Sequence, residues 1–536
     1  MTSTWDVAIV GGGHNTLVAA AYLARAGHTV TVIERLDHVG GAAVSERPWA
    51  GVDARLSRYS YLVSLLPERV IRDLGLDITL KRRRYSSYTP SPADPGRGIL
   101  VDRGDDSATV ASFARVTGST DEAARFAAFY ERLAPLAQTL FPTVTDPLRR
   151  EKEVRAAIGD DDLFDAVTAR PLGELLRASL DSDIVRGIAL TDGLIGTFAS
   201  ADEDSLRQNR CFLYHVIGGG TGDWDVPVGG MGQVSGALEK AARAAGAEIR
   251  TGATVTAISP DGEVLLEGGE TVGARLVLSG VGPAVLDRLL AAGGGAGTDA
   301  AIPEGAQLKV NMLLRRLPRL HDTSVSPEAA FAGTFHVNET LSQLESAHAA
   351  ASTGSIPDPL PAEIYCHSLT DPSILGPELR ESGAQTLTLF GLHVPHRLVA
   401  DGRVDRDALL AAAQRSLDAV LAEPIADVLY EAPDGSPCIE ARTTADLEDS
   451  LGMVGGDIFH GALSWPWADD DAPLDTPAQR WGVATLHPRV LLCGSGAQRG
   501  GAVSGIGGHN AAMAAMELLD THSGADDRPR LESAHG

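Results

Sequence analysis

Residues 5–34 have the sequence WDVAIVGGGHNTLVAAAYLARAGHTVTVIE, and this stretch decides the fold class. Residues 5–10 are rich in β-forming side chains, residues 15–26 place alanine and leucine at helical spacing, and residues 28–34 alternate as a second strand. Gly27 supplies the stop at the end of the helix. A strand, a glycine turn, a helix and a second strand in this order predict the start of a βαβ unit with a parallel sheet.

The glycine turn at 11–16, GGGHNT, predicts a dinucleotide site. Gly11 permits a tight turn, and Gly13 lets the helix N-terminus approach a pyrophosphate closely enough for backbone N–H groups to bind it. Thr16 replaces the third glycine of the usual pattern, so we expect the helix to pack on the strand more loosely or in a different arrangement. Glu34 ends the second strand 21 residues after Gly13, where a carboxylate can accept hydrogen bonds from ribose hydroxyls.

The loop after the second strand favours FAD over NAD. Gly40 and Gly41 follow Glu34-Arg35 in the segment LDHVGGAAV. A flexible backbone at this place can rest against the pyrophosphate of an extended flavin dinucleotide. A plain surface turn is the alternative interpretation of the two glycines.

Composition excludes several classes of protein. The chain has 536 residues and a formal net charge of −26, so nucleic acid and anionic lipid surfaces are poor partners. Its four cysteines form no CxxC or similar pair, which argues against a zinc site or a redox-active disulfide and favours a reducing compartment. The N-terminus leaves no room for a signal peptide, and no apolar run is long enough for a membrane span. We expect a cytoplasmic protein of two to four domains.

Changes in pattern along the chain predict an interleaved domain organisation. Amphipathic helical patterns fill 105–215, a glycine-rich break follows at 218–234, and strand patterns return between 305 and 440. The predicted parts are an FAD-binding domain in three pieces (1–80, 218–300 and 481–520), a mostly helical insertion or substrate region (81–217), a substrate domain (301–480) and a disordered tail (521–536).

Four sequence blocks together resemble a known family. They are GGGHNTLVAAAYLARAG (11–27), IERLDHVGGAAVSE (33–46), PVGGMGQVSGALEKAARAAGAEIRTGATV (227–255) and LLCGSGAQRGGAVSGIGGHNAAMAAM (491–516). In this order they resemble the phytoene desaturase-like FAD-dependent oxidoreductases, and most closely the branch called pyridine nucleotide-disulfide oxidoreductase domain-containing protein 2. The disulfide in that name has no counterpart here, because the chain has no CxxxxC pair.

The resemblance implies a fold and a cofactor. It implies an α/β fold with a Rossmann-like FAD-binding domain of the flavin amine oxidase and phytoene desaturase type, an interleaved α+β substrate domain and a helical insertion. It also implies FAD, which we expect to be noncovalent because no cysteine lies in a recognisable attachment sequence. The implied FAD-binding residues are Gly11, Gly13, Glu34, Arg35, Gly40 and Gly41 at the adenosine diphosphate moiety, Val255 beside the adenine, and Gly494, Ser495 and Gly505 around the ribityl chain and ring.

The last block departs from the family pattern. Gln498-Arg499 stands where members often have a histidine-proline pair, and His509 stands where they often have an arginine. The resemblance implies that these positions lie near the flavin ring, so the tuning of the ring and the substrate preference transfer less readily than the cofactor itself.

Lys309 and His460 are the candidate catalytic residues. Lys309 shares one face of a predicted strand with Asn311 and Leu313. Related flavin amine oxidases place a strand lysine, through a water, against N5, and a solvated edge-strand lysine is the alternative. His460, in GGDIFHG, resembles a family block near the cavity, with a structural histidine as the alternative.

Other conspicuous residues receive structural interpretations. His14 is expected to support the phosphate turn, and the pair Trp465 and Trp467 to pack in a core or line a channel. The basic run 81–84 is expected to be a solvated turn or a dock for an anion. No metal site is predicted, because His215, His393 and His396 lack the spacing of metal ligands.

The predicted function is an FAD-dependent dehydrogenase or desaturase that transfers hydride from an apolar organic substrate to flavin N5. The alternatives are a flavin amine oxidase, a redox-neutral flavin isomerase, and a flavin-binding protein that binds or regulates a partner with little catalysis. The sequence leaves the electron acceptor, the oligomeric state and any peripheral membrane contact open.

Overall fold

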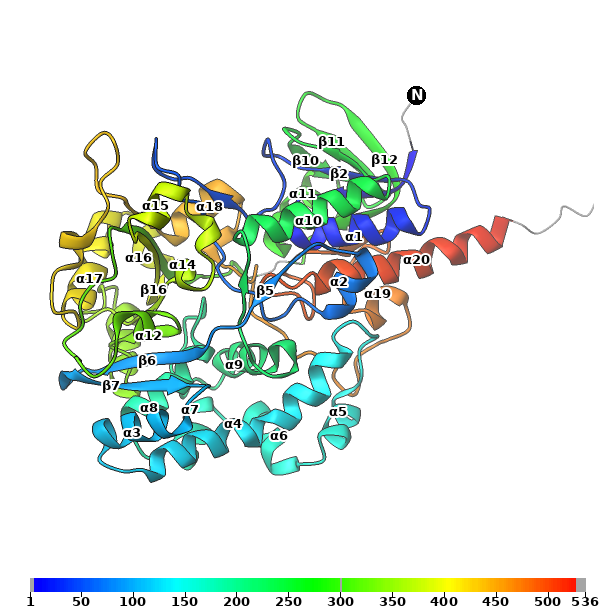
Figure 1. Cartoon of the computed structure of the whole chain (residues 1–536). Helices are drawn as coiled ribbons and strands as arrows, with labels where there is room; N and C mark the ends of the chain where they lie inside the picture. Colours follow the sequence, from blue (N-terminus) through cyan, green and yellow to red (C-terminus); the bar gives the residue numbers. More distant parts are fainter. Residues whose placement is uncertain (1–3, 299–300, 527–536) are drawn as a thin grey trace, which may run out of the picture.

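The computed structural model describes residues 4–298 and 301–526 (Figure 1). The apolar β-forming segments build a first sheet in the order β10-β11-β12-β1-β2-β9, with β18 paired to β12. Strands β9, β2, β1, β12 and β18 are parallel, which is the doubly wound order of dinucleotide-binding domains. The strands are β1 (Thr4–Val10), β2 (Val30–Ile33), β9 (Glu248–Arg250), β10 (Val255–Ile258), β11 (Glu263–Leu266), β12 (Thr271–Ser279) and β18 (Val490–Leu492).

Helices cover both faces of this sheet, which explains why residues 7–10 of β1 and all of β2 are apolar or small and buried. Helix α1 (His14–Arg25) packs between α10 (Met231–Ala244) and α20 (Ile506–Asp526) on one face, and α11 (Pro283–Ala292) packs on the other. Figure 1 shows α10, α1 and α20 side by side. Close contact of α1 with α20 needs a glycine, because a Cβ at Gly508 would lie 1.8 Å from the carbonyl oxygen of Asn15.

The second sheet has the strand order β17-β13-β16-β15-β14-β6-β7 and is antiparallel except between β14 and β6. Its first two strands in the chain come from the segment 81–217, so that mostly helical segment also contributes to the second sheet. The strands are β6 (Tyr85–Ser91), β7 (Asp94–Asp102), β13 (Ala306–Leu314), β14 (Thr334–Val337), β15 (Ala362–Tyr365), β16 (Gln385–Pro395) and β17 (Ile439–Arg442). Short strands β3 (Ser45–Glu46), β4 (Leu56–Ser57), β5 (Leu80–Lys81) and β8 (Val226–Pro227) form two further pairs.

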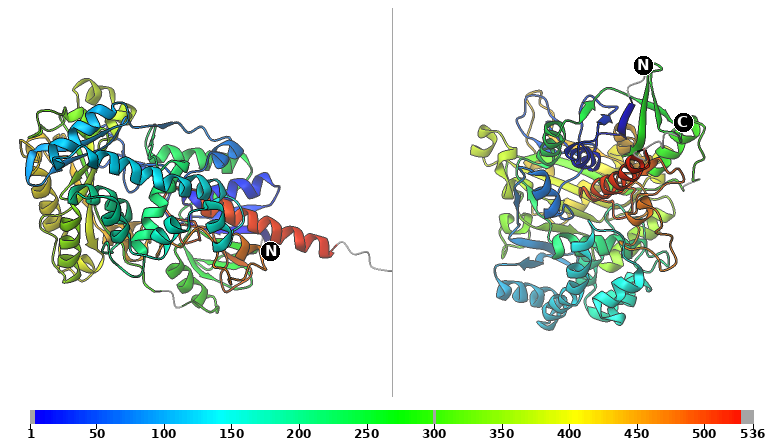
Figure 2. Two further views of the ribbon diagram at one scale, coloured as in Figure 1. Left: turned by 90° about the horizontal axis from the view of Figure 1, so that it is seen from below. Right: turned by 90° about the vertical axis from the view of Figure 1, so that its right-hand side faces the viewer.

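A bundle of helices follows β7 in the chain and packs below the two sheets (Figures 1 and 2). Asp105 and Asp160 cap α3 and α6, and Gly118 and Gly159 end α3 and α5 in left-handed conformation. The bundle contains α3 (Asp106–Thr117), α4 (Asp121–Leu140), α5 (Glu151–Ile158), α6 (Asp161–Thr168), α7 (Leu172–Ser179), α8 (Asp183–Leu190) and α9 (Arg207–Ile217). Its buried leucines and phenylalanines form a core of their own.

The remaining helices lie mostly around the second sheet. They are α2 (Glu68–Leu74), α12 (Pro327–Phe331), α13 (Leu341–Ser352), α14 (His367–Thr370), α15 (Pro377–Glu381), α16 (Arg397–Ala400), α17 (Arg406–Asp418), α18 (Thr444–Leu451) and α19 (Pro477–Arg480). The predicted disordered tail at 521–536 is wrong for its first part, because α20 continues to Asp526; residues 527–536 lie outside the described residues. Among the described helices, none combines the length and apolar character needed to cross a membrane.

Candidate functional site

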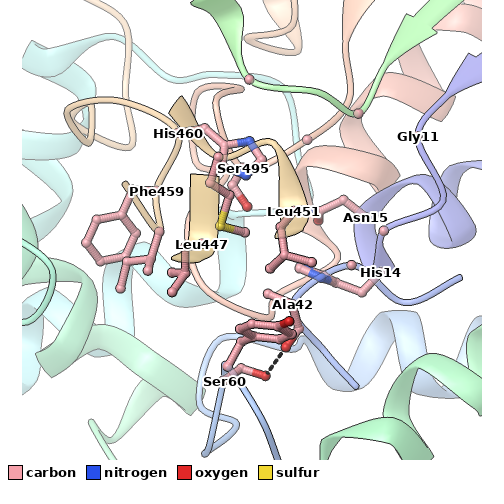
Figure 3. A pocket seen from close by; sticks show the side chains of 18 of the residues that line it. Gly11, His14, Asn15, Ala42, Ser60, Leu447, Leu451, Phe459, His460 and Ser495 are labelled. Carbon is pink, nitrogen blue, oxygen red and sulfur yellow. Dashed lines mark hydrogen bonds between the residues drawn. The ribbon is translucent and has the colours of Figure 1, made fainter. Parts of the chain in front are cut away.

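A cavity of about 360 Å3 joins the carboxyl ends of the parallel strands to the second sheet. Its lining includes the turn after β1, the ends of β2, β12 and β18, and side chains of β13 and β16. Figure 3 shows Gly11 and His14 on one side of the cavity, with Phe459 and His460 on the other. Ligands of open α/β sheets bind outside the carboxyl ends of the strands, so this is the expected place for a dinucleotide.

The glycine turn presents backbone to the cavity. Gly11 adopts φ +95°, and a Cβ at Gly12 would lie 2.8 Å from Val39 Cγ1. Gly13 is the N-cap of α1 and makes no side-chain cap, so the first N–H groups of the helix have no side-chain acceptor. A Cβ at Gly13 would meet no protein atom within 4 Å, because it would point into open space. This arrangement fits an anion at the helix N-terminus.

Thr16 is accommodated by a glycine on the neighbouring strand. A Cβ at Gly280, directly after β12, would lie 2.2 Å from Thr16 Cγ2. The Thr16 hydroxyl donates a hydrogen bond to the Gly13 carbonyl at 2.7 Å. Helix α1 therefore packs closely on the strand in a different arrangement. The small residue at this contact is Gly280 at the end of the strand, and not a glycine in the helix.

Glu34 lines the cavity at the end of β2. Its Oε2 accepts a hydrogen bond from the Gly12 N–H at 2.6 Å, and its Oε1 accepts one from the Leu36 N–H at 2.7 Å. Each carboxylate oxygen keeps a second lone pair that a ribose hydroxyl can use. Arg35 also lines the cavity and donates to the Ser450 carbonyl at 3.0 Å.

The two loop glycines divide their roles. Gly41 lines the cavity, whereas Gly40 does not. Gly40 lies behind the turn, where its N–H donates to the Gly12 carbonyl at 2.8 Å and its φ of +124° requires glycine. The loop is therefore hydrogen-bonded to the glycine turn at 11–16, which a plain surface turn would not be.

The other predicted cofactor residues are also divided. Val255, Gly494 and Ser495 line the cavity, and so do residues 501–503 just before α20. Gly505 does not line it; its left-handed backbone, with φ +71°, packs against Val18 and Leu66. Eight of the ten predicted cofactor-binding residues thus line one cavity, although they come from five separate segments.

Lys309 lies at the other end of the cavity and is buried, with 2% of its surface exposed. Its strand β13 runs between β16 and β17, so the alternative of a solvated edge-strand lysine is wrong. Nζ donates to the carbonyl oxygens of Ser57 at 2.8 Å and Ser60 at 3.2 Å, and lies 5.0 Å from the centre of the Phe390 ring. Burial lowers the pKa of Lys309 well below its usual value, against the attraction of Glu440.

His460 and His14 both line the cavity. His460 has a left-handed backbone with φ +63°, and its buried Nδ1 has no hydrogen-bond partner in the structure. His14 Nε2 lies 3.1 Å from the Ala502 carbonyl oxygen, which links the phosphate turn to the loop before α20. Burial lowers the pKa of each histidine to about 4, so both are uncharged at neutral pH.

Sequence reasoning missed the aromatic residues of the cavity. Tyr61 stacks in parallel with Trp224 at 6.5 Å and packs against Phe390 at 4.4 Å. His215 stacks on Trp224 at 4.8 Å, and its buried Nε2 has no hydrogen-bond partner among the described residues. Phe390 lies beside Lys309 through the pairing of β16 with β13, and no sequence pattern links these two residues to Tyr61 or Trp224.

The tryptophan pair and the Gln498-Arg499 motif do not line the cavity. Trp465 and Trp467 stack on each other at 5.3 Å in the core of the helical bundle and do not line the cavity. Arg499 is 2% exposed and donates to the carbonyl oxygens of Thr143 and Asp146, which ties the bundle to the last loop. Gln498 and His509 are likewise absent from the cavity lining.

The basic run 81–84 is exposed at Lys81, Arg82 and Arg84, as predicted for a solvated segment, but Arg83 is buried. Arg82 pairs with Asp225 at 2.8 Å and Arg84 with Asp102 at 2.9 Å. Arg83 is 9% exposed and donates to the Trp224 carbonyl at 3.3 Å, beside the aromatic part of the cavity. Burial lowers its pKa.

Comparisons with known proteins identify the family. Residues 9–68 match the model of the NAD(P)-binding Rossmann-like domain. The chain is 31% identical over 562 residues to pyridine nucleotide-disulfide oxidoreductase domain-containing protein 2 of Rattus norvegicus, covering 95% of this chain and 92% of the relative. The chain belongs to the family of that protein. This confirms the resemblance predicted from the four sequence blocks.

A further sequence relative and two solved structures also match this chain. An uncharacterised protein of Mycobacterium tuberculosis is 55% identical over 528 residues, covering 96% of this chain and 97% of the relative. Cyclohexylamine oxidase from Brevibacterium oxydans matches with a TM-score of 0.58 at 15% identity, covering 97% of this chain and 100% of that chain. A putrescine oxidase variant matches with a TM-score of 0.58 at 17% identity, covering 98% and 100%. At these identities the two oxidases show the fold alone, and they confirm the predicted α/β class.

Proposed function

We propose that this protein is an FAD-dependent oxidoreductase that dehydrogenates an apolar organic substrate. The observation that carries the proposal is the continuity of the cavity. One space begins at the glycine turn and Glu34 and ends at Lys309 and Phe390. A dinucleotide that occupied the first part would bring its far end beside the apolar part, where a substrate could bind.

The residues of the first part fit FAD. The uncapped N-terminus of α1 and the open space beside Gly13 suit a pyrophosphate, and Glu34 suits the ribose. Ser495 and the loop 501–503 would then surround the flavin end. When bound, FAD supplies a hydride acceptor at N5 of its ring. No cysteine lines the cavity among the described residues, which supports noncovalent binding.

Lys309 is our candidate for the group that accepts the proton that the substrate loses together with the hydride. In its uncharged form, Nζ has two N–H bonds, which the carbonyl oxygens of Ser57 and Ser60 accept. The lone pair then remains free to accept a hydrogen bond from a water or a substrate group. His460 is uncharged and lines the same cavity, so it is the second candidate.

The charge of the cavity supports an uncharged apolar substrate. Glu34 is the one acidic side chain among its described lining residues, and it lies at the nucleotide end. The substrate end contains mainly aromatic and aliphatic side chains, including Tyr61, Phe390 and Leu463. A protonated amine would find no carboxylate there to replace its lost hydration.

An amine oxidase is the second candidate, because the faces of Tyr61 and Trp224 could contact a cationic substrate. The electron acceptor stays unspecified. We also propose a cytoplasmic location, which is supported by four cysteines that are all buried and free.

The test is the absorption spectrum of protein purified without added cofactor, followed by acid release of the chromophore. We expect flavin bands and released FAD; a colourless protein that also fails to bind added FAD would overturn the proposal. The holoprotein is then mixed anaerobically with a panel of apolar alkenes and saturated precursors, and with a matched panel of amines. Bleaching by the first panel supports the dehydrogenase, and bleaching by amines alone supports the second candidate.

A further inference from the structure

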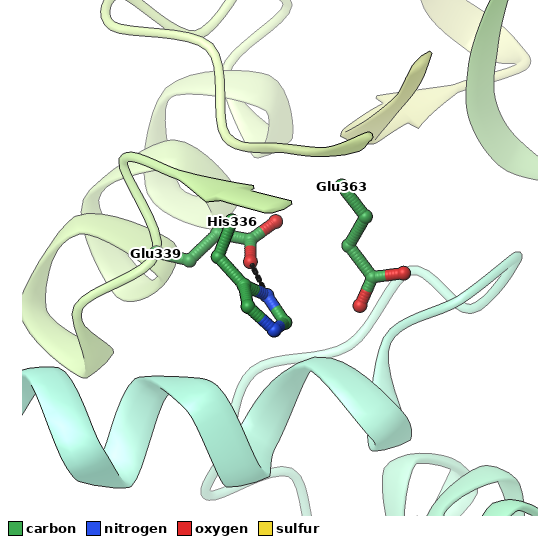
Figure 4. Close-up of side chains that lie close together, drawn as sticks. All are labelled: His336, Glu339 and Glu363. Carbon is green, nitrogen blue, oxygen red and sulfur yellow. Dashed lines mark hydrogen bonds and ion pairs between the residues drawn. The ribbon is translucent and has the colours of Figure 1, made fainter. Parts of the chain in front are cut away.

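Three buried side chains converge behind the cavity, on the second sheet. His336 of β14 and Glu363 of β15 are paired in register, and Glu339 follows β14 by two residues (Figure 4). Their exposed fractions are 4%, 3% and 1% for His336, Glu363 and Glu339. None of the three lines the cavity, so the proposed oxidation does not use them.

The ligand atoms of this cluster lie close together. One imidazole nitrogen and one oxygen from each glutamate all lie within 4.8 Å of one another. Zinc and similar ions bind nitrogen and oxygen ligands at about 2.0–2.2 Å, so small side-chain adjustments would place all three around one ion. Divalent ions are commonly bound by three protein ligands, with further coordination positions left for water.

A second observation concerns Glu339 itself. Its Oε2 lies 2.5 Å from His336 Nδ1, but its buried Oε1 has no hydrogen-bond partner among the described residues. An unpartnered carboxylate oxygen at this depth costs free energy unless a ligand occupies the place. By contrast, Glu363 Oε2 accepts a hydrogen bond from the Tyr365 hydroxyl, a contact that would orient a ligand carboxylate.

The carboxylates of the cluster have no direct cationic partner in the described part of the chain, because the buried Arg83 interacts with Glu363 electrostatically without forming an ion pair. Among the described residues, no arginine or lysine forms an ion pair with Glu339 or Glu363; the ion-pair contact is that of Glu339 with His336. Asp192, after α8, interacts electrostatically with both glutamates and adds a further acidic group. A divalent cation would neutralise two carboxylates beside a neutral imidazole.

We propose that His336, Glu339 and Glu363 form a binding site for a divalent transition-metal ion of the Zn2+ or Mn2+ kind. Mixed imidazole and carboxylate ligands suit such ions better than Ca2+ or Mg2+, which prefer oxygen alone. The sequence analysis predicted no metal site because it considered other histidines, namely His215, His393 and His396. It missed this one because Glu363 joins the pair His336 and Glu339, spaced by three residues, only through strand pairing.

The test uses the full-length protein, produced in medium supplemented with ZnCl2 and MnCl2 and passed through gel filtration. Elemental analysis by mass spectrometry should find about one Zn2+ or Mn2+ per chain. The variants Glu339→Gln and Glu363→Gln should each retain at least about tenfold less metal. Glu122→Gln is the matched control, because Glu122 is also buried, at 3% exposure, but accepts backbone N–H groups in the helical bundle.

A titration guards against variants that fail to fold. Wild-type protein stripped with a chelator should unfold at a midpoint several degrees higher after addition of Zn2+ or Mn2+. The proposal is overturned if supplemented wild-type protein holds no stoichiometric metal and the midpoint does not move. It is also overturned if both glutamine variants retain as much metal as wild type. In that case the three side chains would be held together by shared protons and not by a metal ion.

Discussion

The two ends of the cavity are built in different ways. The nucleotide end is made of backbone: Gly11 to Gly13 and Gly41 leave space, and Glu34 is held by two N–H groups of neighbouring loops. The substrate end is made of side chains from distant segments, such as Tyr61, Lys309 and Phe390. The first end depends on short-range geometry that a motif specifies, whereas the second depends on how two sheets are brought together.

The largest expected effect is at the nucleotide end. The Gly13→Val side chain would meet no protein atom within 4 Å of its Cβ, so the fold should tolerate it. The same side chain would occupy the space proposed for the pyrophosphate and should weaken FAD binding at least about 100-fold, which is close to 3 kcal/mol. Flavin content and binding titrations measure this.

Gly236→Ala in α10 is the matched control, since a Cβ there also meets nothing within 4 Å and faces no cavity. It should keep both fold and flavin. Normal FAD binding by Gly13→Val would contradict the assignment of the nucleotide end.

At the substrate end, Lys309→Met should leave flavin bound and reduce the rate of substrate-driven flavin reduction about 100-fold, as expected for loss of a proton acceptor. Burial lowers the pKa of Lys309, and only the uncharged amine can accept a proton. The wild-type rate should therefore fall as pH decreases through that lowered pKa, and the variant should lack this limb. Stopped-flow reduction at a series of pH values measures both.

Lys81→Met is the control, because Lys81 is exposed on β5. An unchanged pH profile in Lys309→Met would remove Lys309 from the reaction and leave His460 as the candidate.

The contact between α1 and β12 gives a smaller effect on stability. Gly280→Ala should lower the free energy of unfolding by about 1–3 kcal/mol, because its Cβ would lie 2.2 Å from Thr16 Cγ2. Adding Thr16→Gly should recover part of the loss. Denaturant unfolding of the two single variants and the double variant measures the coupling. Additive effects would show that the two positions do not compensate each other.

The smallest effect concerns His460. Burial lowers its pKa to about 4, whereas the unfolded chain has a histidine pKa of about 6.5. Between these values the unfolded state binds more protons, so wild type should lose stability as pH falls through this window. His460→Asn, which tolerates the left-handed backbone, should lose about 1 kcal/mol less between pH 7 and about pH 5.5. Equal losses in the two proteins would show that His460 is solvated.

Residues 5–34 could be interpreted from sequence because each requirement there is local. A tight turn, an uncapped helix and a carboxylate at a strand end leave a pattern in neighbouring residues. Lys309 was recognised as a strand residue, but its burial depends on β16 and β17, which lie about 80 and 130 residues later. Arg83 was misjudged for the same reason, since Trp224 and Thr334, which accept its hydrogen bonds, are distant in sequence.

The amino-acid sequence by itself determined the βαβ start, the family and the glycine-lined end of the cavity, because backbone conformation and strand or helix preference act over a few residues. Only the tertiary structure decided that Lys309 is buried, that Trp465 and Trp467 belong to a core, and that His336, Glu339 and Glu363 converge. Burial and side-chain convergence depend on pairing between strands and on packing between layers. Those contacts join residues whose separation along the chain carries no information about their distance in space.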